Sequence, residues 1–217
     1  MYKNIWLWDV DHTFNKNLKI VLSSTLSRME TDRKDSGGGS RGTSLIGSTL
    51  GASPTLSPYT ESGAYTTLAI AYPFVATDII NPLNFIKETS SHIKANVALI
   101  NAAIEYKPVE SLLIKVSGGV ENRDDRTDNF TTSNFYRSNG SASVSTSQYT
   151  SFLNENTISY LNTFNDIHTL SAVAGFTYQD FVNTSLTGSS SGFLSNNFES
   201  YDLSAGEVHN FQNYYQN

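Results

Sequence analysis

The chain contains no cysteine, which excludes disulfide bonds, thiol nucleophiles and cysteine-ligated metals. Charged residues are also scarce, at 16% of 217 residues, and the formal net charge is −6. Without a stripe of Lys and Arg to neutralise phosphates, nucleic-acid binding is excluded. No stretch approaches the roughly 18 consecutive apolar residues of a transmembrane helix. Aromatic residues, by contrast, reach 12%, and many rings with few charges suit strands whose ends lie at a membrane interface.

A β-hairpin pattern is clearest between Asn101 and Arg126. Apolar residues occupy every second position on both sides of a short turn at Lys107–Ser111. Because side chains alternate along a strand, one face of the second arm is apolar and the other polar. The apolar face of that arm is formed by Leu112, Ile114, Val116, Gly118 and Val120.

Three such hairpins are predicted, at about residues 4–28, 92–124 and 144–180, with turns at Asn15–Asn17, Lys107–Ser111 and Asn165–Ile167. Long Ser/Thr/Asn/Gly-rich loops are expected at about 29–91, 125–143 and 181–217, with one helical turn near Asn81–Glu88. Arms of about ten residues match a tilted strand that crosses a bilayer, and transmembrane barrels combine short turns at one end with long loops at the other. The sequence therefore predicts an all-β antiparallel meander of about six strands, a section of a transmembrane β-barrel with long extracellular loops.

The charged residues indicate which face meets lipid. Mid-strand charges fall opposite the apolar face, and Arg28 and Lys94 break this rule only near loop ends, where long side chains can snorkel. The apolar face is therefore expected to contact lipid and the polar face to line the lumen. The charges on the polar face are Lys19, Glu105, Lys115, Glu121 and Glu155.

Several segments resemble one family of barrels. The most specific is Phe164–Gln179, FNDIHTLSAVAGFTYQ, and the others are Asp11–Ile20, Arg28–Thr31, Ala52–Thr55, Asn81–Leu83 with Phe85–Ile86, and Leu153–Tyr160. Together they are similar to SusC/RagA-type TonB-linked outer-membrane proteins over roughly residues 11–203. That resemblance implies a closed barrel of about 22 strands with a plugged lumen. It also implies import of oligosaccharides or peptides across the outer membrane of a Gram-negative bacterium, with a SusD-like surface lipoprotein and the TonB complex as partners, and no enzyme activity or cofactor.

The chain is expected to be a fragment of such a barrel. It holds about six strands, shows no plug domain and starts with MYKNIWLWDV, which lacks the features of a signal peptide. Residues 1–8 and 207–217 depart from the family pattern.

Two short motifs approach catalytic signatures, and neither is complete. Gly37–Ser44 is close to a phosphate-binding loop, but Thr43 stands where the lysine is required and no helix pattern follows. Gly188–Gly192 matches G-x-S-x-G formally, yet it lies in a Ser-rich stretch without the strand and helix of a nucleophile elbow. Both are interpreted as loops, and no catalytic or cofactor-binding residue is predicted.

Metal sites are not predicted either. His12, His92, His168 and His209 are widely spaced, and His12 and His168 are interpreted as interface residues near the turns. The acidic residues near 121–128 lack the spacing of a calcium loop, and Arg123 and Arg126 interrupt them. A solvated loop with internal ion pairs is favoured for this cluster, whose members are Glu121, Asp124, Asp125 and Asp128.

Aromatic residues in the predicted loops are the candidates for ligand contact. Rings of this kind either stack on the C–H surface of sugars or pack within the loops, and the substrate-binding residues stay unknown at this point. The set comprises Tyr59, Tyr65, Tyr72, Phe135 and Tyr136.

Two functions from different classes follow. The first is a wall section of a TonB-dependent transporter. The second is a secreted, soluble all-β binding or adhesion domain whose apolar faces pack together as a sandwich. The asymmetry of the loops and the family resemblance favour the first.

Overall fold

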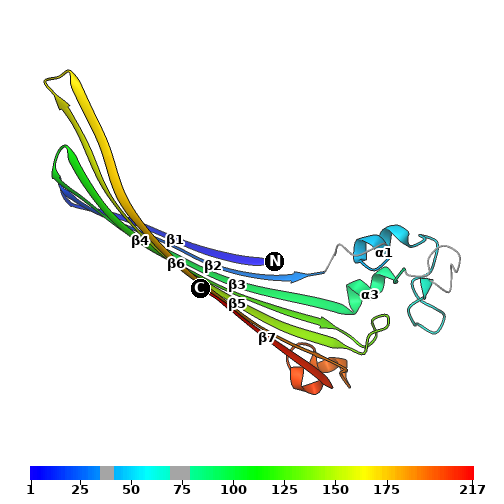
Figure 1. Ribbon diagram of the computed structural model, residues 1–217. Helices are drawn as coiled ribbons and strands as arrows, with labels where there is room; N and C mark the ends of the chain where they lie inside the picture. Colours follow the sequence, from blue (N-terminus) through cyan, green and yellow to red (C-terminus); the bar gives the residue numbers. More distant parts are fainter. Residues whose placement is uncertain (35–41, 69–78) are drawn as a thin grey trace.

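The computed structural model describes residues 1–34, 42–68 and 79–217, and its main feature is one long, curved sheet (Figure 1). Seven strands follow one another in sequence order, and every neighbouring pair is antiparallel. Their bounds are β1 (Tyr2–Asn15), β2 (Leu18–Arg33), β3 (Thr89–Val109), β4 (Leu112–Thr131), β5 (Ser141–Phe164), β6 (His168–Ser191) and β7 (Val208–Gln216). The predicted meander is confirmed. A second sheet, as the sandwich alternative requires, is absent from the described ranges.

Three tight turns lie together at one end of the sheet (Figure 1). In the first, the Asn15 side chain accepts hydrogen bonds from the backbone N–H groups of Asn17, at 2.8 Å, and Leu18, at 3.0 Å. In the third, Asn165 and Asp166 adopt φ values of 52° and 55°, the left-handed conformation that a type I′ hairpin turn requires. The turns predicted at Asn15–Asn17 and Asn165–Ile167 are confirmed, since asparagine and aspartate tolerate this geometry. The turn predicted at Lys107–Ser111 is shorter, because β3 continues to Val109 and β4 begins at Leu112.

Strands extend further from the turns than the sequence predicted. β4 continues to Thr131 and β6 to Ser191, so the loops expected at 125–143 and 181–217 are largely strand. The tail of the chain also forms β7, a strand that the sequence analysis missed. The reason is physical: beyond the apolar stretches both faces of these strands are polar, so the alternation of hydrophobicity disappears while the backbone keeps pairing.

Short helices pack at the loop end. α1 (Leu45–Gly51) is capped by Ser44, whose Oγ accepts a hydrogen bond from the Gly47 N–H at 3.2 Å. α3 (Pro82–Lys87) confirms the predicted helical turn, with Asn81 as its N-cap and proline in the first turn, where its missing N–H costs nothing. The described helices include none that is long and apolar enough to span a membrane.

The buried apolar residues that the structure describes lie at the loop end, except Ala95, which lies within β3 in its loop-proximal half. Leu68 and Ile79 form one small cluster with Ala52 and Leu56 packed against it. Phe130, Ala142 and Phe193 form another, partly covered by Leu203 and Ala205 around the short 3-10 helices η1 (Asn196–Phe198) and η2 (Leu203–Ala205). The half of the sheet near the turns has no buried apolar side chain among the described residues.

Candidate functional site: two sheet faces and a loop pocket

The strand register sorts the side chains of β1 to β6 into two faces. Directly opposed residues share a face, and in these strands even-numbered residues oppose even-numbered ones, as in the row His12, Ile20, Ile104 and Val116. We call the even-numbered side the apolar face and the odd-numbered side the polar face. The exposed large hydrophobic residues of the apolar face in the turn-proximal half include Trp6, Trp8, Val10, Phe14, Leu22, Leu26, Ile100, Ile104, Tyr106, Val116, Val120, Phe152, Ile158, Phe164, Leu170, Phe176 and Tyr178.

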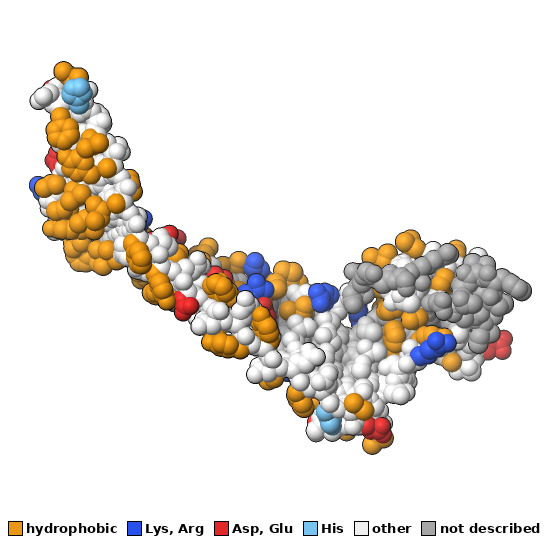
Figure 2. Space-filling model, in the orientation of Figure 1, with side chains coloured by type: hydrophobic (Ala, Val, Ile, Leu, Met, Phe, Trp, Pro, Cys, Tyr) orange, Lys and Arg blue, Asp and Glu red, His pale blue; other side chains and the backbone are white. Residues whose placement is uncertain are grey.

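Hydrophobic side chains gather over the end of the sheet that carries the turns (Figure 2). Further along the strands the apolar face changes character. The row Glu30, Lys94 and Arg126 occupies the same face, and nearby ion pairs join Arg28 to Glu30 at 2.7 Å and Arg126 to Asp128 at 2.9 Å. The apolar band is therefore limited to the turn-proximal half of each strand.

The polar face carries a row of alternating charges across neighbouring strands. Lys19 opposes Glu105, which opposes Lys115, and the Lys115 and Glu105 side chains are 3.6 Å apart. Lys19 also pairs with Asp11 at 2.7 Å. The predicted placement of these charges is confirmed, although the separation of faces is incomplete. The apolar residues on the polar face include Leu7, Val97, Leu99, Val173 and Phe181.

A shallow groove of about 470 Å³ runs along the polar face. Small side chains open it, among them Ser23, Ala103 and Ser117, and the charged Lys115 and Glu155 also line it. Gly119 lies in the same groove, where an added Cβ would come within 2.3 Å of the Asn101 side-chain oxygen. The groove gives this face a hollow, polar surface, in contrast to the apolar band behind it.

The acidic cluster singled out in the sequence is divided by the sheet. Its residues lie within β4 rather than in a loop, so that prediction was wrong, whereas the predicted ion pairs are present, including Arg123 with Asp125 at 2.7 Å. Glu121 and Asp125 are on the polar face and Asp124 and Asp128 are on the other, because side chains alternate. These carboxylates cannot converge on one ion.

The histidines are also separate. His12 packs edge-on against Phe14 at 4.4 Å, and His92 lies 2.6 Å from the Asp32 carboxylate. Within the described ranges no group of three His, Cys, Asp or Glu residues is arranged to hold a metal.

The two motif-like stretches lack catalytic geometry. Ser190, the central residue of Gly188–Gly192, lies within β6 and its hydroxyl contacts the His209 ring nitrogen at 3.1 Å across to β7. That is a cross-strand pair in a continuous strand, not a nucleophile elbow. Gly37–Ser44 lies partly outside the described residues. Contrary to the expectation, a helix does follow it, α1, which is only seven residues long. The motif still lacks its lysine, because Thr43 stands at that position.

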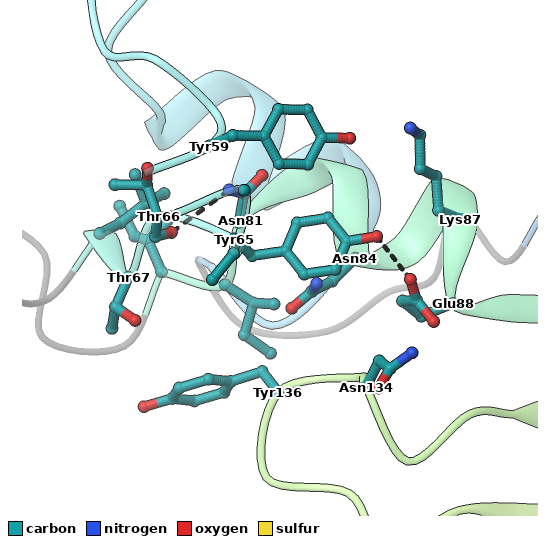
Figure 3. A pocket seen from close by; sticks show the side chains of 15 residues that line it. Tyr59, Tyr65, Thr66, Thr67, Asn81, Asn84, Lys87, Glu88, Asn134 and Tyr136 are labelled. Carbon is teal, nitrogen blue, oxygen red and sulfur yellow. Dashed lines mark hydrogen bonds between the residues drawn. The ribbon is translucent and has the colours of Figure 1, made fainter. Parts of the chain in front are cut away.

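A pocket of about 600 Å³ forms where two loops meet at the end opposite the turns (Figure 3). One loop is the β2–β3 connection, which supplies residues near 59–68 and 79–88, and the other is the β4–β5 connection, which supplies Asn134 and Tyr136. Asn81 joins the parts of the first loop, since its side-chain amide donates to the carbonyl oxygens of Pro58, at 2.8 Å, and Thr66, at 3.2 Å. The backbone N–H of Thr132 donates to the Glu88 carbonyl at 2.9 Å and joins the two loops.

Aromatic and acidic side chains form one wall of this pocket. The rings of Tyr59 and Tyr65 lie 5.5 Å apart at an interplanar angle of 31°. The Tyr65 hydroxyl donates a hydrogen bond to the Glu88 carboxylate (Figure 3). The same carboxylate also accepts a hydrogen bond from the Thr132 hydroxyl. Burial, and then the hydrogen bond to Glu88, raises the pKa of Tyr65, so the phenol keeps its proton and remains a donor.

The loop aromatic residues separate into two groups. Tyr59, Tyr65 and Tyr136 line the pocket together, whereas the Phe135 ring packs edge-on against Phe85 at 5.2 Å. Tyr72 lies outside the described residues. Polar residues of α3 and its caps complete the pocket and were not predicted as site residues; they are Asn81, Asn84, Lys87 and Glu88. The one available signal was the predicted helical turn at these positions.

Comparisons with known proteins agree with this architecture. No family model matches the chain. A curated relative, TonB-dependent receptor P3 of Formosa agariphila, is 26% identical over 210 residues, which cover 93% of this chain. The chain spans about a fifth, 20%, of the length of that relative.

Solved structures of RagAB, described as a peptide transporter, share the fold. One matches 98% of this chain with a TM-score of 0.76 at 19% identity, and the match covers 25% of the RagAB chain. A second, the peptide importer in its closed-closed state, matches the same share with a TM-score of 0.71.

The fold is therefore that of a section of a large antiparallel β-barrel, with tight turns at one end and loops at the other. The predicted resemblance to SusC/RagA-type TonB-linked proteins is confirmed by the receptor and the RagAB structures. These relatives are named as a receptor and as transporters rather than as enzymes.

Proposed function

We propose that the chain forms part of the barrel wall of a TonB-dependent transporter in the outer membrane of a Gram-negative bacterium. The apolar face contacts lipid, the polar face lines the lumen, the tight turns lie on the periplasmic side and the loop pocket lies outside the cell. One observation carries this proposal: on the apolar face of the turn-proximal half, large apolar side chains of all six strands from β1 to β6 are exposed, while none of the buried apolar residues that the structure describes lies in that half.

The extent of the apolar band supports a membrane position. On β4 it runs from Leu112 to Val120, and the next residues on the same face are Asn122 and Asp124. A transmembrane strand needs about ten tilted residues, so the band is long enough to cross the bilayer once. An exposed apolar surface of this size is otherwise a liability in water.

Unpaired strand edges also support a larger barrel. β1 pairs only with β2, and β6 pairs with β7 only from Asn183 to Ser191, which leaves His168–Val182 without a partner on that side within the described residues. In lipid every backbone N–H and C=O group must be satisfied, so further strands are expected at both edges.

The proposed cargo is an oligosaccharide or a peptide. The resemblance to SusC/RagA-type proteins suggests both, together with a SusD-like surface lipoprotein and the TonB complex, and the RagAB structures provide a precedent for peptide import. The loops that follow β2 and β4 carry aromatic and polar groups around a pocket, which supports contact with cargo at this end.

Uptake by cells tests this function. Cells that express the full-length protein should accumulate labelled oligosaccharide or peptide, and both deletion of its gene and a protonophore should abolish the accumulation, since TonB transmits energy from the inner membrane. Uptake of both cargoes that persists after deletion, or that resists the protonophore, would contradict the proposal. A full-length protein found secreted and water-soluble would contradict it as well.

A further inference from the structure

A groove of about 430 Å³ lies on the apolar face just beyond the apolar band, and we call it the charged groove. It begins at the opposed pair Asn96 and Asp124. The preceding row, two residues nearer the turns, consists of Leu26, Ala98 and Asn122, and the band ends there. The charged groove therefore adjoins the surface that is proposed to contact lipid. The residues of the apolar face that line it include Lys94, Asn96, Asp124, Arg126, Gln148 and Thr184.

Two cations face each other in the charged groove. Lys94 is exposed, directly opposes Arg126 on β4 and forms no ion pair with any described residue. Glu30, the neighbour of Lys94 on β2, is already bonded to Arg28 at 2.7 Å. Like charges directly opposite each other destabilise a sheet, and an anion between them removes that repulsion. This end of the groove therefore suits an anionic group.

A carboxylate stands unpaired one row nearer the band. Asp124 is exposed and forms no ion pair with any described residue. Asp128, by contrast, is bonded to Arg126 at 2.9 Å. The residues directly opposite Asp124 are Asn96 and Gln148, which are uncharged. The groove thus presents a pair of cations and, beside it, a carboxylate that suits a cationic group.

The charged groove lies at the depth of the lipid headgroups in the proposed barrel. Two residues of a strand span about 7 Å, or about 5 Å along the membrane normal at the tilt of about 40° usual in such barrels. Asp124 is therefore about 5 Å beyond the end of the band, and Lys94 and Arg126 are about 10 Å beyond it. The headgroup layer is about 5–8 Å thick on each side of the hydrocarbon core, and long basic side chains bend back towards it. Trp6 lies opposite Leu26 at the edge of the band and is 51% exposed, which marks the same interface because tryptophan favours that position.

This pattern of charge distinguishes between lipid headgroups. An anionic headgroup such as phosphoglycerol satisfies the two cations but brings only negative charge near Asp124. A phosphocholine headgroup carries a positive charge without an N–H donor. A phosphoethanolamine headgroup provides both partners, because it combines a phosphate with an ammonium group that has three N–H donors.

We propose that the charged groove binds the phosphoethanolamine headgroup of a membrane lipid. The phosphate lies between Lys94 and Arg126, the ammonium group donates to Asp124, and the acyl chains extend along the apolar band. The inference rests on the proposed position of the band in the bilayer and adds a lipid-binding site on the outer surface of the barrel wall.

Quenching by lipids beside the charged groove tests the proposal. The full-length protein, with any other cysteines replaced, carries a fluorophore on Ala98→Cys, which lies in the row next to the groove and outside its lining. The protein is placed in phosphatidylcholine vesicles, to which brominated phosphatidylethanolamine, phosphatidylglycerol or phosphatidylcholine is added. Brominated phosphatidylethanolamine should quench most strongly, and half of the maximal quenching should need about one fifth of the lipid fraction that brominated phosphatidylcholine needs.

Variants at exposed positions of the labelled protein identify the groups that bind. Lys94→Gln should weaken the binding of phosphatidylethanolamine about fivefold, the effect expected for one basic residue at a membrane surface. Asp124→Asn should remove the preference for phosphatidylethanolamine over phosphatidylglycerol, and Asp124→Lys should reverse it. Lys3→Gln is the matched control: Lys3 is an exposed lysine on the polar face, in the row of Met29, Ala95 and Asp125 between the two rows of the groove, and its loss should change nothing.

The outcomes separate this inference from the transporter function. Equal quenching by the three lipids, a preference of the wild type for phosphatidylglycerol, or an unchanged preference in Lys94→Gln and Asp124→Asn would overturn the lipid site and leave the band in the bilayer. A loss in Lys3→Gln equal to that in Lys94→Gln would overturn it as well. Absence of quenching by every brominated lipid would contradict the position of the band itself, and with it the proposed barrel wall.

Discussion

The two halves of each long strand have different surroundings. Near the turns, the apolar face carries rows such as Ile20, Ile104 and Val116, of which Ile20 is half-buried and the other two are exposed. Near the loops, the same face carries Glu30, Lys94 and Arg126, and the protein there has small aromatic cores of its own. The backbone pairing is continuous through both halves.

This difference shows that pairing and solvent preference are separate properties of a strand. Hydrogen bonds hold the ladder in both halves, whereas the side chains adapt to what surrounds each half. In the proposed barrel, lipid stabilises the turn-proximal half, whereas packing and contact of polar groups with water stabilise the loop-proximal half. Substitutions should therefore have effects that depend on the half in which they lie.

The largest effect is expected in the loop-proximal half, from Phe193→Ala. Phe193 is 6% exposed and packs edge-on against Phe130 at 6.0 Å. Removing a buried phenylalanine costs about 3–5 kcal/mol, here in the local stability of the loop that it anchors. Hydrogen exchange should accelerate in residues 193–207, with no change near the turns.

The neighbouring residue provides the control for this prediction. Leu194 is 91% exposed, so Leu194→Ala should not alter exchange. Equal effects of the two changes would show that the aromatic cluster does not stabilise the loop.

In the turn-proximal half, Val116→Arg should lower the free energy of unfolding of the full-length protein by about 2–4 kcal/mol, because it places a charge at lipid depth. Val116 lies near the middle of the apolar band and is 45% exposed. Urea unfolding in lipid vesicles measures the cost. Gln148→Arg alters the same face in the other half, opposite Asp124, and should be nearly neutral. If Gln148→Arg were the more costly change, the assignment of the two halves would be reversed.

On the polar face, Lys115→Glu should reduce stability by about 1 kcal/mol or less, since it places a carboxylate directly opposite Glu105. The same unfolding experiment should show that added salt reduces this loss, because water in the lumen screens the repulsion. Lys115→Gln is the control that removes the attraction without adding repulsion. A loss as large as that of Val116→Arg would place Lys115 in lipid.

The smallest effect is expected for Asp11→Asn, which removes the partner of Lys19. The two side chains are 58% and 38% exposed, and an ion pair in water contributes little to stability. Unfolding curves of this variant and the wild type should therefore nearly coincide. A loss as large as that of Lys115→Glu would show that the pair is shielded from water.

The turns and the turn-proximal strands could be predicted because local chemistry determines them. Asn15 and the Asn165–Asp166 pair specify tight turns, and period-two hydrophobicity specifies which residues lie on the apolar face. The alternation of apolar and polar residues stops where the apolar band ends, and strands beyond that point were not predicted. β7 was missed for the same reason: its nine residues are all exposed and mix polar and aromatic side chains on both faces.

The loop pocket was predictable only in part. Tyr59, Tyr65 and Tyr136 were recognised as candidate contacts from their residue type. The role of Asn81 depends on the carbonyl groups of Pro58 and Thr66, which are 23 and 15 residues away, and the two loops are joined by Thr132 and Glu88, which are 44 residues apart. Such contacts have no local pattern in the sequence.

The orientation of the two faces can be tested directly, because the chain contains no cysteine and a single introduced one can be labelled alone. The test uses the full-length protein with any other cysteines replaced. A fluorophore is attached to one introduced cysteine at a time, in the variants Ile104→Cys, Ala103→Cys and Lys94→Cys. Each labelled protein is placed in vesicles of brominated lipid, which quenches the fluorescence of a label that lies in the bilayer. Strong quenching is expected for Ile104→Cys, and little for Ala103→Cys on the opposite face or for Lys94→Cys beyond the band. Equal quenching at positions 103 and 104, or stronger quenching at 103 or 94, would contradict the proposal that the apolar band contacts lipid.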